Sequence, residues 1–189
     1  YARPAVADWD EDGRLDLLVA DGRGWVTLFR NEGRTGAPTL APGVRLTAGR
    51  QPIDGSGRGS ALACDWDRDG RPDLLLAMSG ERGDPMSAWG LAKHGLMRGI
   101  LYLPNRGPRG QPRLDVPRWV RAGAERWPID LERPNFGACV DWDGDGRLDL
   151  IACEFENDIR LFRNTADDPA GRPRFAGPAA GEMLYEASS

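Results

Sequence analysis

The sequence has little of several residue types, and each scarcity excludes a class of protein. One Lys and one His accompany 24 Arg, and the three cysteines (Cys64, Cys139 and Cys153) form no CxxC pair. This odd number and spacing exclude a zinc ribbon and a disulfide scaffold. No apolar run approaches the roughly 20 residues that a membrane helix needs. Because Glu occurs 9 times against 20 Asp, and helix-forming stretches are scarce, the composition favours an all-β fold.

Two further classes of feature are missing. The arginines are dispersed among Pro and Gly without an aromatic platform or a basic helix, which argues against nucleic-acid binding. The chain begins at Tyr1 and has no basic-then-apolar leader, so we expect a processed or cut end. Its 189 residues are enough to bury a sizeable core.

What the chain does contain is an internal repeat. The pattern Asp-Trp-Asp-x-Asp-Gly-Arg-x-Asp-Leu occurs three times, with starts 57 and 76 residues apart, at 8–17, 65–74 and 141–150. Leu-Phe-Arg-Asn at 28–31 recurs at 161–164 and, more loosely, at 102–105. An insertion explains the longer second spacing. We therefore predict repeat units of about 1–57, 58–133 and 134–189, with the insertion at 79–98.

Each unit predicts four short strands bounded by Gly, Pro, Asn and Asp. The expected strands are, in order along each unit, 5–7, 61–64 and 137–140; 15–20, 74–78 and 148–153; 25–30, 100–103 and 159–163; and segments around 38–46, 112–120 and 173–184. No window keeps a helical apolar period for ten positions. Four antiparallel strands per repeat are typical of a propeller blade, so we predict an all-β fold with three blades, a partial β-propeller.

The repeated nonapeptide Asp-x-Asp-x-Asp-Gly-x-x-Asp has the composition of a metal loop. Asp at positions 1, 3, 5 and 9 supplies carboxylates, position 7 supplies a backbone carbonyl, and Gly at position 6 permits the sharp turn. Oxygen ligands of this kind favour Ca²⁺ over Zn²⁺ and over the stricter octahedral Mg²⁺. The predicted ligands are Asp8, Asp10, Asp12, Arg14 and Asp16; Asp65, Asp67, Asp69, Arg71 and Asp73; and Asp141, Asp143, Asp145, Arg147 and Asp149.

An EF-hand shares the first six loop positions but needs Glu at position 12 and flanking helices. Position 12 is Val19, Leu76 or Ala152 here, inside an apolar strand segment. We therefore expect up to three Ca²⁺ ions, each in a strand-to-strand hairpin and each with a structural role. Trp9, Trp66 and Trp142 share position 2 and are predicted to pack between blades. The cysteines replace Ala or Val of the sister units, which predicts buried free thiols.

With these motifs the chain resembles the FG-GAP/VCBS repeat family, the calcium-binding propeller repeats of integrin α-subunit heads and of many secreted bacterial proteins. The resemblance covers nearly the whole chain, and segments 15–20 and 24–31 are most similar to the bacterial form. It implies the ligand sets given above, an extracellular, secreted or cell-surface location in a bacterium, and a ring of six to eight blades. Because three units cannot close such a ring, we expect the remaining blades to come from a longer chain, with assembly of several copies as the alternative.

The insertion at 79–98 is the candidate ligand site, because long loops on a rigid scaffold often carry binding residues. It holds Trp89, Lys93 and His94, and its place between the second and third strands predicts that it projects away from the metal loops. These side chains either pack the insertion onto neighbouring blades or bind a ligand, for which carbohydrate is the preferred class because Trp and Arg suit sugars and uronates.

Two functions remain open on the sequence. The leading hypothesis is a non-catalytic extracellular module for ligand binding or cell adhesion. The alternative is a fragment of a secreted polysaccharide lyase or other carbohydrate-active enzyme built on a calcium-bearing propeller. A lyase needs a base and a group that neutralises the carboxylate. Although His94, Lys93 and Tyr102 lie near one another in sequence, no recognisable catalytic constellation emerges.

Overall fold

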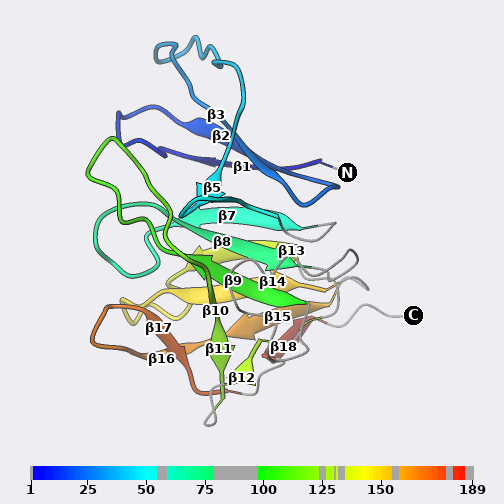
Figure 1. Ribbon diagram of the computed structural model, residues 1–189. Helices are drawn as coiled ribbons and strands as arrows, with labels where there is room; N and C mark the ends of the chain where they lie inside the picture. Colours follow the sequence, from blue (N-terminus) through cyan, green and yellow to red (C-terminus); the bar gives the residue numbers. More distant parts are fainter. Residues whose placement is uncertain are drawn as a thin grey trace.

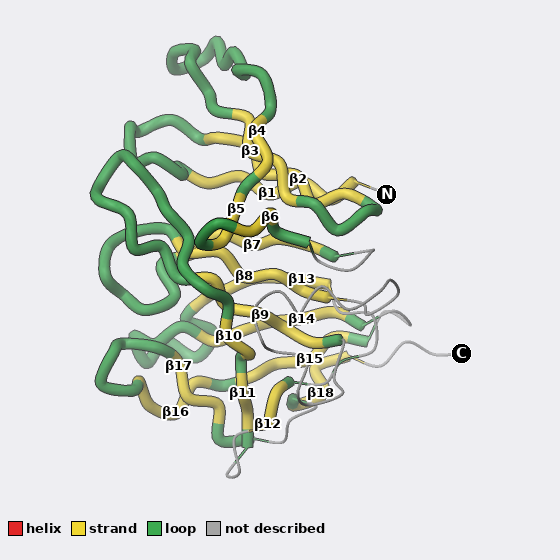
Figure 2. Tube along the Cα trace, viewed as in Figure 1, coloured by secondary structure: helices red, strands yellow, loops and turns green. Residues whose placement is uncertain are grey.

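Three four-stranded antiparallel sheets, one in each repeat, form the body of the molecule (Figures 1 and 2). The computed structural model describes residues 2–54, 59–78, 98–123, 127–129, 131, 135–154, 158–177 and 181–185. The sheets consist of β1 (Ala2–Ala7), β2 (Asp16–Asp21), β3 (Val26–Phe29) and β4 (Val44–Arg45); β7 (Ser60–Cys64), β8 (Asp73–Met78), β9 (Gly99–Leu103) and β10 (Arg118–Trp119); and β13 (Asn135–Val140), β14 (Asp149–Cys153), β15 (Ile159–Phe162) and β18 (Glu182–Tyr185).

The predicted all-β class is confirmed, since none of the described residues is helical. The three sheets are consistent with propeller blades, and the predicted strands of each repeat are found close to their expected positions. The third repeat differs at its last strand. The segment expected around 173–184 is divided between β17 (Pro173–Phe175), which joins another sheet, and β18, which completes its own. No described helix has the length and apolar character that crossing a membrane would require.

The first and second strands of each sheet form a hairpin whose loop is the Asp-rich nonapeptide. The strand pairing places Ala7 opposite Asp16, and Cys64 opposite Asp73. In the third sheet Val140 lies opposite Asp149. The three loops therefore emerge from equivalent ends of three stacked sheets, on the left of Figure 1.

Two apolar cores lie between the sheets, one on each side of the middle sheet. In β8 all six residues are buried, and in β9 all five, whereas β2 alternates between buried and half-buried residues. A sheet covered on both faces has no solvent side, so its strands consist of continuous apolar residues instead of alternating ones. The run Leu74–Ala77 in the middle repeat has this character.

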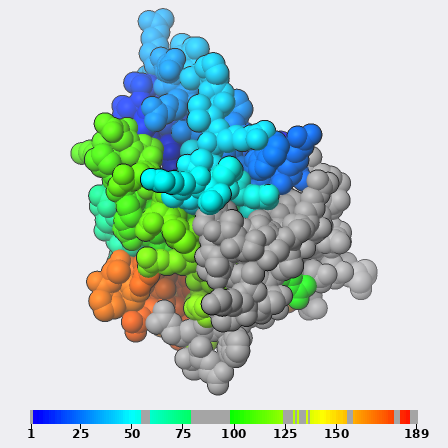
Figure 3. All heavy atoms as spheres, in the orientation of Figure 1, coloured from blue at the N-terminus to red at the C-terminus, as the bar shows by residue number. Residues whose placement is uncertain are grey.

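Short strands outside the three sheets connect neighbouring repeats. They are β5 (Thr47–Ala48) with β6 (Gln51–Pro52), β11 (Arg121–Ala122) with β12 (Trp127–Pro128), and β16 (Asn164–Asp167) with β17. Ala48 makes a parallel bridge to Leu114, and Ala122 makes the equivalent one to Phe175. Figure 3 shows the segments after β9 (green) between those of β4–β6 (cyan) and β16–β17 (orange). Each repeat is thus hydrogen-bonded to the next, a connection that the strand pattern did not predict.

A glycine permits the chain to turn at each of these connections. The NH of Gly49 donates to the Leu114 carbonyl at 2.8 Å, and the NH of Gly123 donates to the Phe175 carbonyl at 2.9 Å. Both glycines have positive φ, 60° and 81°, a conformation that side chains with a Cβ resist. Equivalent geometry at two successive boundaries shows that the repeats stack in one regular manner.

The three tryptophans of loop position 2 differ in burial according to what covers their sheet. Trp9 and Trp66 are each 2% exposed and belong to the first and second core, respectively. Trp142 is 51% exposed, on the sheet of the third repeat. The packing predicted for all three thus holds for two, because among the described residues Trp142 belongs to neither of the two cores. Val140, Met183, Leu184 and Tyr185, on strands of the same sheet, are likewise exposed.

Candidate metal centres

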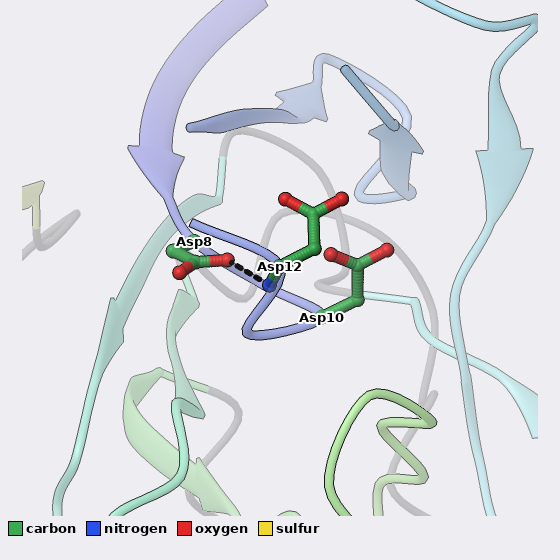
Figure 4. Close-up of side chains that lie close together, drawn as sticks. All are labelled: Asp8, Asp10 and Asp12. Carbon is green, nitrogen blue, oxygen red and sulfur yellow. Dashed lines mark hydrogen bonds between the residues drawn. The ribbon is translucent and has the colours of Figure 1, made fainter. Parts of the chain in front are cut away.

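Each Asp-rich loop is curled by hydrogen bonds from its backbone to its first aspartate. The NH of Gly13 donates to Asp8 Oδ2 at 3.0 Å, and the NH of Asp12 donates to Asp8 Oδ1 at 2.9 Å (Figure 4). The position-6 glycines of the other loops donate to Asp65 and Asp141 at 3.0 and 2.8 Å. All three glycines have positive φ, between 83° and 89°, which explains why Gly occurs at position 6.

Carboxylate oxygens converge in every loop. In each group of three aspartates, the candidate ligand oxygens lie within 4.8 Å of one another: Asp8, Asp10 and Asp12; Asp65, Asp67 and Asp73; and Asp141, Asp143 and Asp149. Positions 1 and 3 are common to all the groups. The third member is position 5 in the first loop and position 9 in the others, so the structure brings together three of the four predicted aspartates per loop.

The aspartates outside these groups are held by other contacts. Asp69 and Asp145 pair with the guanidinium groups of Arg71 and Arg147, two residues further along the loop, as Asp12 also does with Arg14. The backbone NH of each of these arginines donates to the same aspartate. This arrangement tightens the second half of the loop around position 7, whose carbonyl is the predicted ligand.

The position-9 aspartates are buried and have a second task. Each one accepts the backbone NH groups of the Trp of position 2 and of the Asn that follows the third strand, and Asp73 also accepts the NH of Asp67, at 3.3 Å. The donors are Trp9 at 3.1 Å and Asn31 at 2.7 Å to Asp16; Trp66 at 3.1 Å and Asn105 at 2.6 Å to Asp73; and Trp142 at 2.9 Å and Asn164 at 2.7 Å to Asp149. Position 9 therefore joins the loop to the third strand whether or not it also binds an ion.

No role was predicted for this Asn from the sequence. Its recurrence in all three repeats, as Asn31, Asn105 and Asn164, was the available signal. Asn105 is buried, and its side-chain oxygen accepts the NH groups of Gly107 and Arg113 at 3.0 and 2.9 Å. Its Nδ2 donates to the Pro72 carbonyl at 3.1 Å. The Asn thus closes the loop after the third strand and holds the end of the Asp-rich loop through the Pro72 carbonyl.

Several carboxylate oxygens in the first two loops lack the partners that a buried polar atom needs. The Oδ1 atoms of Asp10, Asp65 and Asp67 are buried and accept no hydrogen bond. Burying such an atom without compensation is unfavourable, and buried charges are normally paired or bound to metal. The donor set consists only of hard oxygens, so a divalent cation that prefers oxygen fits these atoms.

The pKa values of these loops reflect the same crowding. Burial, together with the charges of Asp16 and Asp12, raises the pKa of Asp10 above its usual value. Burial and the charge of Asp67 likewise raise the pKa of Asp69. Burial raises the pKa of Asp73 to about 7. Each shift means that the ionised form lacks sufficient positive charge nearby, which a bound cation would supply.

An arginine approaches the position-3 aspartate of every loop. Arg30 Nη1 lies 3.7 Å from Asp10 Oδ2, and Arg163 Nη1 lies 3.1 Å from Asp143 Oδ2; both arginines come directly after the third strand. In the second loop the cation is Arg106, with Nη1 2.9 Å from Asp67 Oδ2. These guanidinium groups offset part of the carboxylate charge but leave the Oδ1 atoms of Asp10 and Asp67 without a partner.

Tyr102, on β9, contacts the second Asp-rich loop. Its buried hydroxyl donates to Asp67 Oδ2 at 2.8 Å and lies 3.3 Å from Asp73 Oδ2. Burial and the charge of Asp73 raise the pKa of this hydroxyl well above its usual value. Sequence reasoning considered Tyr102 beside His94 and Lys93, as part of a lyase site, whereas its hydroxyl contacts carboxylates of the second Asp-rich loop. Sister repeats carry Leu at this position, so no repeat signal pointed to it.

The predicted ligand residues of the insertion, Trp89, Lys93 and His94, lie outside the residues that the structure describes. The direction in which the insertion projects is likewise outside the described part. Its flanking strands, β8 and β9, are paired along their length, with Met78 opposite Gly99.

The comparisons with known proteins agree with the repeat pattern. Residues 8–76 match the family model described as an FG-GAP-like repeat, a segment that includes the first two Asp-rich loops and the strands between them. No curated protein and no solved structure matches the chain. This match over residues 8–76 is consistent with the FG-GAP/VCBS repeat family that the motifs indicate.

Proposed function

We propose that this chain is a calcium-binding segment of a β-propeller, in which each Asp-rich loop holds one Ca²⁺ ion. The observation that supports this most directly is the group of three convergent carboxylates in each loop, with buried oxygens in two loops that accept no hydrogen bond. FG-GAP repeats are often calcium-binding and typically extracellular. The ion would cross-link the two ends of its loop and neutralise the carboxylates, which is a structural role.

The proposed ligands follow the nonapeptide positions. They are the carboxylates of positions 1, 3, 5 and 9 and the carbonyl of position 7, which belongs to Arg14, Arg71 or Arg147. We also propose that the units 1–57, 58–133 and 134–189 are successive blades. The exposed face around Trp142 would then receive a further blade, as the equivalent faces around Trp9 and Trp66 already do.

Calcium titration of the chelator-stripped full chain tests the metal assignment. Isothermal titration calorimetry is expected to give three equivalents of Ca²⁺. The double variant Asp10→Asn/Asp12→Asn should bind two, because it removes two of the three grouped carboxylates of the first loop. Glu11→Gln is the matched control: it removes one charge from the same loop at a position outside the group, and three equivalents should remain. Absence of calcium binding in the unmodified chain would contradict the proposal.

The biological task that we propose is non-catalytic ligand binding or adhesion outside the cell, with carbohydrate as the preferred ligand class. It is supported by the repeat type and by the composition of the 79–98 insertion, with Trp89, Lys93 and His94 as the proposed contacts. Tyr102, one of three residues considered for a lyase, already donates its hydroxyl to the second metal loop.

Binding and catalysis can be separated in one set of assays with the full chain in calcium. Affinity for uronate polymers is expected to fall at least tenfold in Trp89→Ala, while β-elimination remains at the background rate in the unmodified chain. Substitution of Trp25 serves as a surface control. This residue lies at the first sheet, and the guanidinium carbon of Arg45 is 3.3 Å from the centre of its ring. β-Elimination that disappears in His94→Ala would contradict a non-catalytic role.

A further inference from the structure

Two of the three cysteines lie against each other across the boundary between two repeats. Cys64 ends β7 and Cys139 lies on β13, and their Sγ atoms are 3.1 Å apart although 75 residues separate them in sequence. These two strands are the first strands of neighbouring sheets, and they contact each other directly. A disulfide bond is about 2.05 Å long, so the sulfurs need to approach by only about 1 Å. We propose that Cys64 and Cys139 form a disulfide bond that joins the second repeat to the third.

The equivalent boundary between the first and second repeats carries alanine at both positions. Ala7, like Cys64, directly precedes the first aspartate of its loop, and Ala63, like Cys139, lies two residues before it. The alanines pack against the first core and the cysteines against the second. A methyl group is therefore sufficient for packing at this place. The sulfur atoms add a reactive pair that the other boundary lacks.

Cys153 is placed where it cannot join this pair. It lies on β14 opposite Asn135, whereas Cys139 is opposite Leu150, three residues away along the same strand. At about 3.3 Å per residue this separation amounts to roughly 10 Å. The proposed bond therefore uses two cysteines and leaves Cys153 as a thiol, which accounts for the odd number.

The bond forms by thiol–disulfide exchange with a low-molecular-weight disulfide such as oxidised glutathione. The thiolate of one cysteine attacks that disulfide, a mixed disulfide forms, and one small thiol leaves. The sulfur of the second cysteine then displaces the other small thiol and completes the S–S bond. The two protein thiols lose two electrons and two protons, and the small disulfide gains both to become two thiols. An oxidising extracellular compartment supplies such an oxidant.

The bond would tether two metal loops at their first strands. Cys64 is adjacent to Asp65, and Cys139 lies two residues before Asp141. The same two repeats already meet through Arg68, whose guanidinium contacts the Gly146 carbonyl and lies 3.0 Å from Asp167. Closing a long segment of chain reduces the freedom of the unfolded state, so the bond should stabilise the pair of repeats without requiring the ion.

Thiol counting on the full chain tests the proposal. The reduced protein is treated with oxidised glutathione, denatured, alkylated and weighed, with and without calcium. We expect three alkylated cysteines before oxidation and one afterwards, which peptide mapping identifies as Cys153. The oxidised protein should melt about 5–10 °C higher than the reduced one, and a phosphine reductant should reverse this shift.

Cys64→Ala and Cys139→Ala are suitable variants because alanine already occupies both positions at the other boundary. Each should fold, show no oxidation-dependent shift in melting temperature and form no intramolecular disulfide, its remaining cysteine of the pair being either alkylatable or joined to glutathione. Cys153→Ala is the matched control and should oxidise as the unmodified chain does. Three free thiols after oxidation, a bond to Cys153, or only intermolecular dimers would overturn the proposal. Calcium binding is measured separately, so failure of the bond leaves the metal assignment unaffected.

Discussion

Removal of calcium is expected to lower the melting temperature of the full chain by on the order of 20 °C, or to leave it unfolded at room temperature. An ion that binds only the folded state at 100 times its dissociation constant stabilises that state by about 2.7 kcal/mol. Three such ions would contribute about 8 kcal/mol, comparable with the roughly 5–15 kcal/mol that stabilises an ordinary domain. At this chain length, about 1 kcal/mol shifts the melting temperature by roughly 2–4 °C.

The physical reason lies in the carboxylates. Without an ion, Asp10 and Asp67 each keep a buried oxygen that accepts no hydrogen bond, and burial raises the pKa of Asp10 and Asp73. Folding must therefore bring like charges together and remove them from water, which is unfavourable. A bound cation would offset both the repulsion and the loss of hydration, because it attracts the carboxylates and occupies the space between their oxygens.

Melts followed by circular dichroism in calcium and in EDTA measure this effect at matched ionic strength. The Asp10→Asn/Asp12→Asn variant provides an internal scale, because losing one of three sites should reduce the calcium-dependent shift to about two thirds. Magnesium at the same concentration should restore less stability than calcium does, since the loops offer flexible carboxylates instead of a strict octahedron. Equal melting temperatures in calcium and EDTA would contradict the proposed role of the ion.

Truncation of two tryptophans at the same repeat position should have very different results. Trp66→Ala is expected to cost about 3–5 kcal/mol of unfolding free energy, and Trp142→Ala less than about 1.5 kcal/mol. Trp66 is 2% exposed and packs against Tyr102 and Phe175, with ring centres 6.3 and 5.9 Å away. Trp142 is 51% exposed, so truncation leaves a smaller cavity and removes less apolar area from the interior.

Urea unfolding in saturating calcium measures both variants, and calcium titration confirms that each keeps its metal sites. The two substitutions remove the same side chain from the same loop position. The difference between their losses of unfolding free energy therefore reports only what covers each sheet. An equal cost would contradict an uncovered third sheet. Analytical ultracentrifugation would then show whether copies of the chain associate through the face around Trp142.

Much of the local structure could be predicted because it depends on local physics. The position-6 glycines of the metal loops adopt the positive φ that their place in the motif implies, and the strands before and after each loop pair as expected. The repeat made these predictions reliable, since three copies of one pattern must satisfy the same backbone geometry. Pro173–Phe175 was assigned to the third sheet, but it pairs with β16 and, through Phe175, with Ala122 of the second repeat, a contact that depends on how the repeats stack.

Partners that occur in only one repeat could not be predicted. Tyr102 and Arg106 both reach Asp67, yet the equivalent of Tyr102 is Leu28 or Leu161 in the other repeats. The contact depends on the position of the third strand relative to the loop, which no spacing within the loop encodes. The contact of Cys64 with Cys139 is a similar case. Cys64 lies one residue before its loop and Cys139 two residues before its own, so the two positions are not equivalent in the repeat and meet only when the sheets stack.

The amino-acid sequence by itself determined the strands, the curled Asp-rich loops and the oxygen-only donor set, because backbone conformation and metal preference follow from residue type and spacing. Only the tertiary structure decided which three carboxylates converge in each loop, which of three equivalent tryptophans is left exposed, and which two sulfurs touch. These outcomes depend on how one sheet packs on the next, and identical motifs differ in burial according to whether another sheet covers them.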